Sequence, residues 1–165
     1  MARTKIDKSL LDLSGTYTFT GQLIGKGTAT NDSAAAGYIG EYVSSAVTST
    51  TAASSTGTTS DLTSISLTAG DWDARLQGHW RVNALVADVL IGIGTASGDN
   101  QTGLIVGSNS ATQTQTFIAS GVQSQTVAPY RVSLSATATI YYKYSSDFTG
   151  AAPDLRGIIA ARRVR

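Results

Sequence analysis

The sequence predicts an all-β protein, an antiparallel β-sandwich with a jelly roll as the expected topology. Gly, Ser, Thr and Ala dominate the composition, and charged residues make up only 14% of the chain, against roughly 25% in an average soluble domain. Several segments alternate apolar and polar residues, which is the period of a half-buried strand. Turn signals recur roughly every 8–15 residues and divide the chain into about eight or nine candidate strands.

The centre of the predicted core is residues 62–82, which we interpret as two strands joined as a hairpin at residues 69–71. In the second strand every other residue is apolar or small: Trp72, Ala74, Leu76, Gly78, Trp80 and Val82. The residues between them are polar or charged: Asp73, Arg75, Gln77, His79 and Arg81. One set should therefore face the core and the other should face water. Both tryptophans of the chain belong to the buried set.

The remaining strands follow from composition and turn residues. Before the centre we expect short strands at residues 16–20 and 38–47, then a long Ser/Thr-rich loop at residues 48–60. After the centre, residues 85–94 are almost continuously apolar, which predicts a strand buried on both faces. The last expected elements are short strands at 103–106 and 115–119, a second long pair at 128–135 and 137–148, and a final strand at 155–164.

Residues 1–30 are expected to form an N-terminal arm that precedes a head domain at residues 31–165. Within residues 1–14, apolar residues recur with partly helical spacing among charged ones, namely Ile6, Leu10, Leu11 and Leu13. An isolated helix of this length is marginal in water. We therefore expect either a frayed tail or an extended or short-helical arm that docks on a partner surface through these four residues.

The sequence lacks the residue combinations that most enzymes need. It has no cysteine and a single histidine, His79, so a thiolate metal site and a histidine pair are excluded. Asp71 and Asp73 lie two residues apart, but Asp71 follows Gly70 at a predicted turn, where Asp commonly bonds the backbone. The glycines at residues 92–98 and 25–28 lack the spacing of dinucleotide and phosphate loops. We expect no enzyme activity, no cofactor and no metal site.

Charge and hydropathy argue against two classes of partner. The formal net charge is +1, which gives no strong field toward nucleic acid or anionic lipid. No apolar run approaches the roughly 18 residues of a membrane-spanning helix. We therefore expect neither nucleic-acid binding nor membrane insertion. A small basic cluster near the C-terminus is interpreted as a source of salt bridges at an end strand or a subunit contact: Arg156, Arg162, Arg163 and Arg165.

Residues 62–73, Leu-Thr-Ser-Ile-Ser-Leu-Thr-Ala-Gly-Asp-Trp-Asp, resemble a motif common in small tail-fibre and virion structural proteins of bacteriophages and prophages. Residues 31–41 resemble the segment that leads into the domain of that family, and residues 130–142 and 157–165 resemble its C-terminal half. The resemblance implies a β-sandwich head that forms a homotrimer. In that family the head usually closes a longer fibre chain, so we expect here a short fibre with its own docking arm.

The resemblance and the residues together predict a structural protein of the phage particle, made in the host cytoplasm. It would be a short tail fibre or head fibre whose arm binds other tail or capsid proteins and whose head contacts the host surface. Two alternatives remain. One is a capsid decoration or cement protein, which differs from the fibre mainly in its place on the particle. The other is a saccharide-binding module, in which Tyr130 and Tyr141 would stack on the sugar rings of a host surface glycan.

Overall fold

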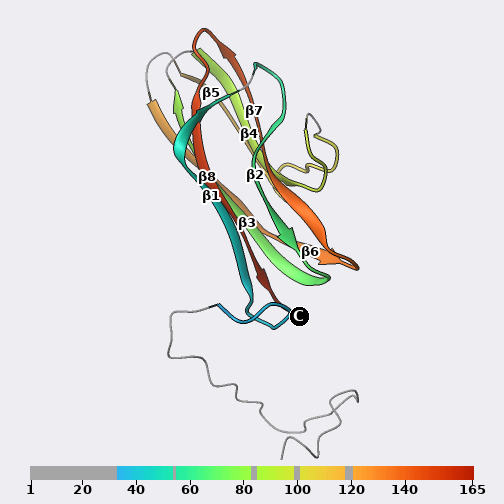
Figure 1. Ribbon diagram of the computed structural model, residues 1–165. Helices are drawn as coiled ribbons and strands as arrows, with labels where there is room; N and C mark the ends of the chain where they lie inside the picture. Colours follow the sequence, from blue (N-terminus) through green and yellow to red (C-terminus); the bar gives the residue numbers. More distant parts are fainter. Residues whose placement is uncertain (1–32, 54, 83–84, 99–100, 118–120) are drawn as a thin grey trace, which may run out of the picture. The chain divides into compact units, whose positions relative to one another are not determined.

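Eight antiparallel strands form two four-stranded sheets that pack face to face (Figure 1). The computed structural model describes residues 33–165 except 54, 83–84, 99–100 and 118–120. The strands are β1 (Tyr42–Ala52), β2 (Ser60–Leu67), β3 (Gly70–Val82), β4 (Leu85–Gly94), β5 (Ser110–Phe117), β6 (Gly121–Leu134), β7 (Ala138–Thr149) and β8 (Asp154–Arg163). The arm proposed for residues 1–30 and the strand expected at residues 16–20 lie outside the described residues.

The order of the strands is that of a jelly roll. Sheet A has the order β1-β8-β3-β6, and sheet B has the order β2-β7-β4-β5. Hydrogen bonds join β1 to β8, β2 to β7, β3 to β6 and β4 to β5, so the first half of the domain runs antiparallel to its second half as one long ribbon. Wrapping that ribbon places successive strand pairs alternately in the two sheets. The predicted fold class is confirmed.

The hairpin predicted at residues 62–82 is wrong, although both of its strands exist. β2 belongs to sheet B and β3 to sheet A, so residues 68–69 carry the chain from one sheet to the other. The pair expected at 128–135 and 137–148 is divided in the same way, since β6 bonds to β3 whereas β7 bonds to β2 and β4. Alternation reports which face of a strand is buried, but it does not report which strand lies beside it.

Some strand boundaries, and one expected short strand, also differ from the predictions. β1 begins at Tyr42, after turns at residues 36–40, and continues to Ala52, so the first part of the expected loop at 48–60 is strand. At the end of this stretch, Thr51 and Ala52 pair with Leu155 and Asp154 at the start of β8. The stretch is rich in threonine, a residue that favours strands. Residues 103–106 do not form a strand; Val106 makes only an isolated bridge to Ser110.

The alternation predicted for β3 is confirmed, and it places the core between the sheets. Trp72, Leu76 and Trp80 are each at most 1% exposed. The Trp80 ring meets the Tyr144 ring of sheet B edge to face, with 6.2 Å between ring centroids. Sheet B also contributes aliphatic residues to this core: Ile65, Leu67, Val89, Ile91, Ile93 and Ile140. Each large side chain buried in this way stabilises the fold by about 1.5–3 kcal/mol.

β4, the strand expected to be buried on both faces, is covered on its outer face by a loop. Its inner face carries the aliphatic side chains named above. On the outer face, a Cβ atom at Gly92 would lie 2.9 Å from Leu104, and one at Gly94 would lie 2.9 Å from Lys143. Residues 91–94 are all buried. The prediction is therefore confirmed for this part of the strand, and glycine is what allows the covering side chains to come so close.

Two facing glycines let the sheets approach closely at one point. Gly78 of β3 and Gly157 of β8 are register partners, and Tyr142 of β7 packs against them. A Cβ atom on Gly157 would lie 2.5 Å from the backbone oxygen of Gln77 and 2.5 Å from the Tyr142 ring, and one on Gly78 would collide with the Tyr142 hydroxyl. Tyr142 is fully buried, its hydroxyl has no hydrogen-bond partner among the described residues, and burial raises its pKa.

A double-mutant cycle tests this packing. Gly157→Ala and Gly78→Ala should each lower the free energy of unfolding by about 1–3 kcal/mol, because an added methyl group overpacks the core. In a Tyr142→Phe background, Gly78→Ala should lower the free energy of unfolding by less, since the hydroxyl that its methyl group would meet is absent. The cost of Gly157→Ala should persist, since the Gln77 carbonyl remains. Denaturant unfolding measures all of these values, and equal relief of both glycine variants would contradict the described contacts.

Candidate functional site

The first described residues and the last residues of the chain lie at the same end of the sandwich, which we call the base. Gly40 N donates a hydrogen bond of 3.0 Å to Arg163 O, and Arg163 N donates one of 2.9 Å to Glu41 O. β1, β3, β5 and β7 end, and β2, β4, β6 and β8 begin, at the opposite end, which we call the apex (Figure 1). The two ends therefore differ, because the described lead into β1 and the last residues of the chain both lie at the base.

Residues 33–41 form a lead-in segment of tight turns. Tyr38 N donates to Ala35 O at 3.1 Å, and Glu41 N donates to Tyr38 O at 3.0 Å. Gly37 and Gly40 have φ angles of +86° and +92°, a region that glycine enters without steric cost. Ser33 Oγ accepts a hydrogen bond of 2.8 Å from Tyr42 N. The lead-in segment thus delivers the chain to the first residue of β1 in a fixed geometry.

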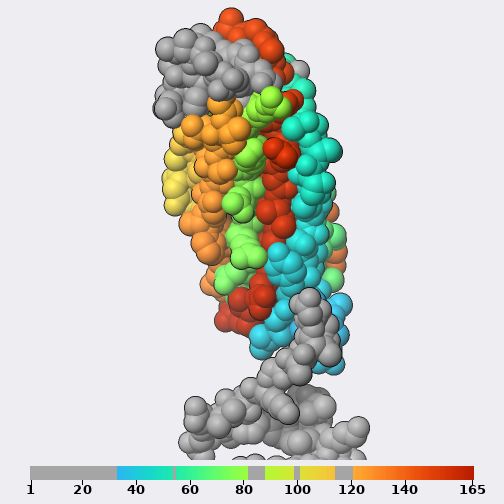
Figure 2. All heavy atoms as spheres, turned by 90° about the vertical axis from the view of Figure 1, so that its left-hand side faces the viewer, coloured from blue at the N-terminus to red at the C-terminus, as the bar shows by residue number. Residues whose placement is uncertain are grey.

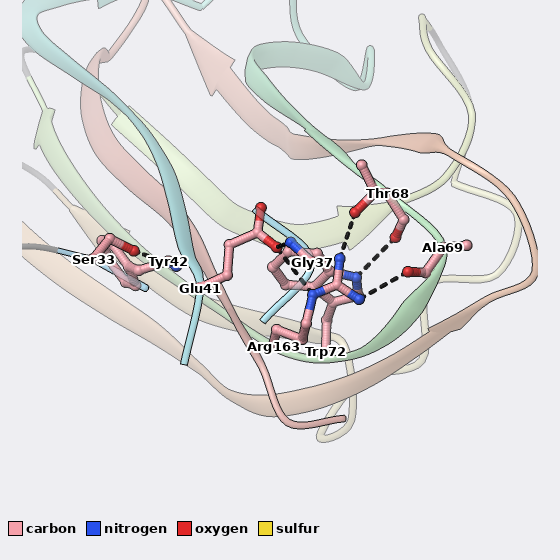
Figure 3. Close-up of polar contacts among 8 residues, drawn as sticks. All are labelled: Ser33, Gly37, Glu41, Tyr42, Thr68, Ala69, Trp72 and Arg163. Carbon is pink, nitrogen blue, oxygen red and sulfur yellow. Dashed lines mark hydrogen bonds and ion pairs between the residues drawn. The ribbon is translucent and has the colours of Figure 1, made fainter. Parts of the chain in front are cut away.

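Arg163 holds the lead-in segment to the rest of the base (Figure 3). Its Nε donates to Glu41 Oε2 at 2.9 Å, its Nη1 donates to Ala69 O at 2.8 Å, and its Nη2 donates to Thr68 Oγ1. Its guanidinium lies 4.3 Å from the centre of the Trp72 ring. The side chain is only 5% exposed. One buried arginine therefore joins the lead-in segment, the β2–β3 link and β3, and we call this group the Arg163 clasp.

The clasp fixes Glu41 as a carboxylate. Gly37 N donates a 2.7 Å hydrogen bond to Glu41 Oε2, and this bond, together with the charge and hydrogen bond of Arg163, holds the pKa of Glu41 below its usual value although burial opposes the shift. A carboxyl group in this state is a poor proton donor near neutral pH. The arrangement can hold chain segments together, and it offers no group suited to acid–base chemistry.

A second ion-pair group at the base surrounds Asp71. Arg131 of β6 donates from Nε and Nη2, each at 2.8 Å, and Arg165 Nε lies 2.8 Å from Asp71 Oδ2. Hydrogen bonding and charge from Arg131 lower the pKa of Asp71, with a further contribution from Arg165, against the effect of burial. The interpretation of Asp71 as a turn residue that bonds the backbone is therefore wrong. The aspartate instead joins β3, β6 and the C-terminus.

Apolar side chains at the base are exposed around these ion pairs. Tyr38 and Ile39 of the lead-in segment are 68% and 72% exposed, and Val164 is 40% exposed. The backbone bonds between Gly40 and Arg163 place the two groups beside one another. Exposed apolar side chains that lie together in this way are typical of surfaces that contact another protein.

The candidate site residues from the sequence fall in separate places. Ile6, Leu10, Leu11 and Leu13 lie outside the described residues. Tyr130, on β6 of sheet A, lines a hollow of about 270 Å³ beside the β4–β5 connection. Tyr141, on β7 of sheet B, lies under the Lys143 ammonium, 5.3 Å from the ring centre. Tyr130 packs against the core between the sheets, whereas Tyr141 lies with Lys143 on the outer face of sheet B, so these two tyrosines do not form one stacking surface for a sugar chain.

Sequence reasoning missed a buried lysine on the outer face of sheet B. Lys143 lies between the core residues Tyr142 and Tyr144 of β7, a position that a period of two would place in solvent, yet it is fully buried. Its Nζ lies 2.5 Å from Asp61 Oδ1 and donates to Gly98 O at 2.8 Å, and Ser97 Oγ and Gly98 N donate to Asp61 Oδ2. Burial opposes the charge on Asp61, but these donors keep its pKa below the usual value. The network ties the β4–β5 connection to β2 and β7.

His79 lies on the outer face of sheet A, as its position on β3 predicted. Its Nε2 is 3.2 Å from Arg156 Nη2, and its Nδ1 is 3.4 Å from Ser124 Oγ. Among the described residues, no group of three or more His, Cys, Asp or Glu side chains is placed to hold a metal ion. The same part of the chain contains no helix with the length and apolar character needed to span a membrane.

No protein-family profile, curated protein or solved structure matches the chain.

Replacing Glu41 by Gln tests the clasp. The variant keeps the shape but leaves buried Arg163 without its carboxylate, so the free energy of unfolding at pH 7 should fall by about 1–3 kcal/mol. The exposed Asp73→Asn is the control, with an expected change below about 0.5 kcal/mol.

The pH dependence of this effect has a fixed sign. The folded-state pKa of Glu41 lies below its ordinary value of 4.5, so the unfolded chain binds more protons between the two pKa values. The stabilisation by ionised Glu41 is complete above about pH 4.5 and is lost as the pH falls through the folded-state pKa. Urea titrations over this range should show the wild type and Glu41→Gln converging, and a constant gap would contradict the clasp.

Proposed function

We propose that this chain is a non-enzymatic structural protein of a bacteriophage particle, a short fibre with an N-terminal docking arm and a trimeric head. The single observation that carries the proposal is the difference between the two ends of the sandwich. The chain reaches β1 at the base, where the Arg163 clasp fixes the lead-in segment. A segment joined before Ser33 therefore attaches at the base, and the apex points away from the point of attachment.

The construction of the base suits a head that is held through its first strand. A pull on the lead-in segment acts on the Glu41–Arg163 ion pair and on the β1–β8 ladder, which begins at the Tyr42 and Arg162 pair. β8 is bonded in turn to β3 in the middle of sheet A. The load is thus spread over three strands, and no single connection has to bear it.

The surface supports a role in assembly. The exposed apolar residues Tyr38, Ile39 and Val164 surround the clasp, so the base offers a contact surface for copies of this chain or for the proteins that carry the fibre. The low charge of the chain means that little charge must be desolvated when copies pack together. The resemblance of residues 62–73 to phage fibre proteins agrees with this function.

Removing the docking arm tests the proposal. A chain that lacks residues 1–13 should fold and trimerise but should not incorporate into particles, because the apolar residues of the arm are gone. Light scattering coupled to size exclusion measures the trimer, and immunoblotting of purified particles measures incorporation.

Two results would contradict the proposal. A monomeric full-length chain would remove the trimer, and unchanged incorporation of the shortened chain would remove the arm. Electron microscopy of the particles separates a fibre from a capsid decoration protein, since it shows where the chain sits. A matched control with residues 2–5 deleted, which keeps all four apolar arm residues, should incorporate normally.

A further inference from the structure

The outer face of sheet A carries a trough that the proposed function does not use. A hollow of about 440 Å³ is lined by residues that include Gln77, His79, Arg156 and Ile158. A second, of about 310 Å³, shares Gln77 and Ile158 with the first. A third, of about 210 Å³, shares Arg75 with the second. The three hollows therefore adjoin one another along β8, on the face of β6, β3, β8 and β1 that Figure 2 shows.

Side-chain size creates the trough. Its floor is β8, where Ile158 is half-buried and Ala160 is only 2% exposed although both face outward. Longer polar side chains of the neighbouring strand β3 form a wall, with Arg75 and Gln77 both exposed. The trough is thus an elongated groove with an apolar floor and a polar wall on the β3 side.

The trough is cationic although the whole chain is nearly neutral. Arg75, Arg156 and Arg162 line it, and none of the three forms an ion pair with a carboxylate among the described residues, where the ion pairs use Lys143 and other arginines. Asp73, the register partner of Arg162, is the one carboxylate among the described residues that line the three hollows. The arginines therefore exceed the carboxylates there.

The arginines are held in place at both ends of the trough. Arg156 Nη2 lies 3.2 Å from His79 Nε2. At the other end, the guanidinium groups of Arg75 and Arg162 each lie 5.9 Å from the centre of the Tyr42 ring. A guanidinium carries five N–H donors, and these contacts occupy few of them. Donors remain for a ligand, and little side-chain entropy has to be lost when it binds.

We propose that this trough binds an acidic polysaccharide. Carboxylate or sulfate groups of successive sugars pair with Arg156 at one end and with Arg75 and Arg162 at the other, because arginine recognises such anions through paired hydrogen bonds. Gln77 and Ser124 donate to or accept from sugar hydroxyls between them. The apolar floor at Ile158 and Ala160 contacts the faces of the sugar rings.

An acidic polysaccharide fits the trough better than the other candidate ligands. A compact anion would fill one hollow and leave the others empty. Proteins bind single-stranded nucleic acid through aromatic rings on which bases stack, but the Tyr42 ring in the trough is already in contact with the guanidinium groups of Arg75 and Arg162. A second copy of the head would have to desolvate three arginines without carboxylates to receive them. Binding of an acidic polysaccharide would add a ligand to the proposed fibre head. The test of this binding does not depend on the trimer or on the phage particle.

The test uses the full chain and three dextrans of equal length: dextran sulfate, carboxymethyl dextran and unmodified dextran. Affinity electrophoresis should show binding to both anionic polymers and none to the neutral one. Arg156→Gln and Arg162→Gln should each weaken binding at least about threefold, and Arg156→Lys should lose less than Arg156→Gln. The matched control is Arg81→Gln, which removes the same charge from the exposed face of β3 outside the trough and should change affinity by less than about twofold.

Several results would overturn the proposal. An equal loss of affinity in Arg156→Gln, Arg162→Gln and the control Arg81→Gln would mean that the polymers bind by general attraction between opposite charges and not at the trough. Binding to neutral dextran, or absence of binding to both anionic polymers, would contradict the ligand class. Tighter binding of single-stranded oligonucleotide than of either anionic dextran would assign the face to nucleic acid. A change in oligomeric state of Arg156→Gln or Arg162→Gln, measured by light scattering, would assign the face to contact between copies.

Discussion

The packing of one sheet on the other is the interaction on which the rest of the structure depends. The inner faces meet around Trp72, Trp80 and Tyr144. At Gly78 and Gly157 of sheet A, the absence of a side chain leaves room for Tyr142 of sheet B. Of the seven connections between successive strands, six carry the chain from one sheet to the other, and the connection from β4 to β5 stays within sheet B. The strand pairs of the jelly roll stay together because burial of these large side chains holds the layers in one register.

That core leaves the two ends and the outer faces free for different tasks. At the base, buried and half-buried ion pairs around Arg163 and Asp71 tie the lead-in segment and the C-terminus to the middle of sheet A. On the outer face of sheet B, Lys143 and Asp61 hold down a long connection. On the outer face of sheet A, the arginines of the trough form no ion pair with a carboxylate of the described residues. This difference from the paired charges that support the fold is what the proposal of a ligand rests on.

Sequence reasoning reached the features that depend on a single strand. The period of two in β3 identified Trp72 and Trp80 as core and Gln77 as outward-facing, because burial of alternate side chains is a local pattern. It failed where distant segments meet. Glu41 and Arg163 are 122 residues apart, and nothing near either residue indicates the other. The hairpin at residues 62–82 failed for the same reason, since a short link between strands can turn within one sheet or cross to a second.

Local pattern also misplaced residues whose surroundings are made by another segment. A period of two would place Lys143 in solvent, but glycine at position 94 leaves room for its side chain and the β4–β5 connection covers its charge. The trough was equally invisible, because its walls come from β3 and its floor and two of its arginines from β8. The arm residues proposed from the sequence, Ile6, Leu10, Leu11 and Leu13, remain a prediction.

The orientation of the head on the particle is the central claim, and one measurement tests it most directly. An epitope inserted after Ala151, an exposed residue of the β7–β8 connection at the apex, can be located on particles by immunogold electron microscopy. Attachment at the base predicts that the gold lies at the outer end of the fibre, away from the particle surface. Gold held against the particle, with the base pointing outward, would contradict the proposed polarity and with it the role of the Arg163 clasp in tethering the head.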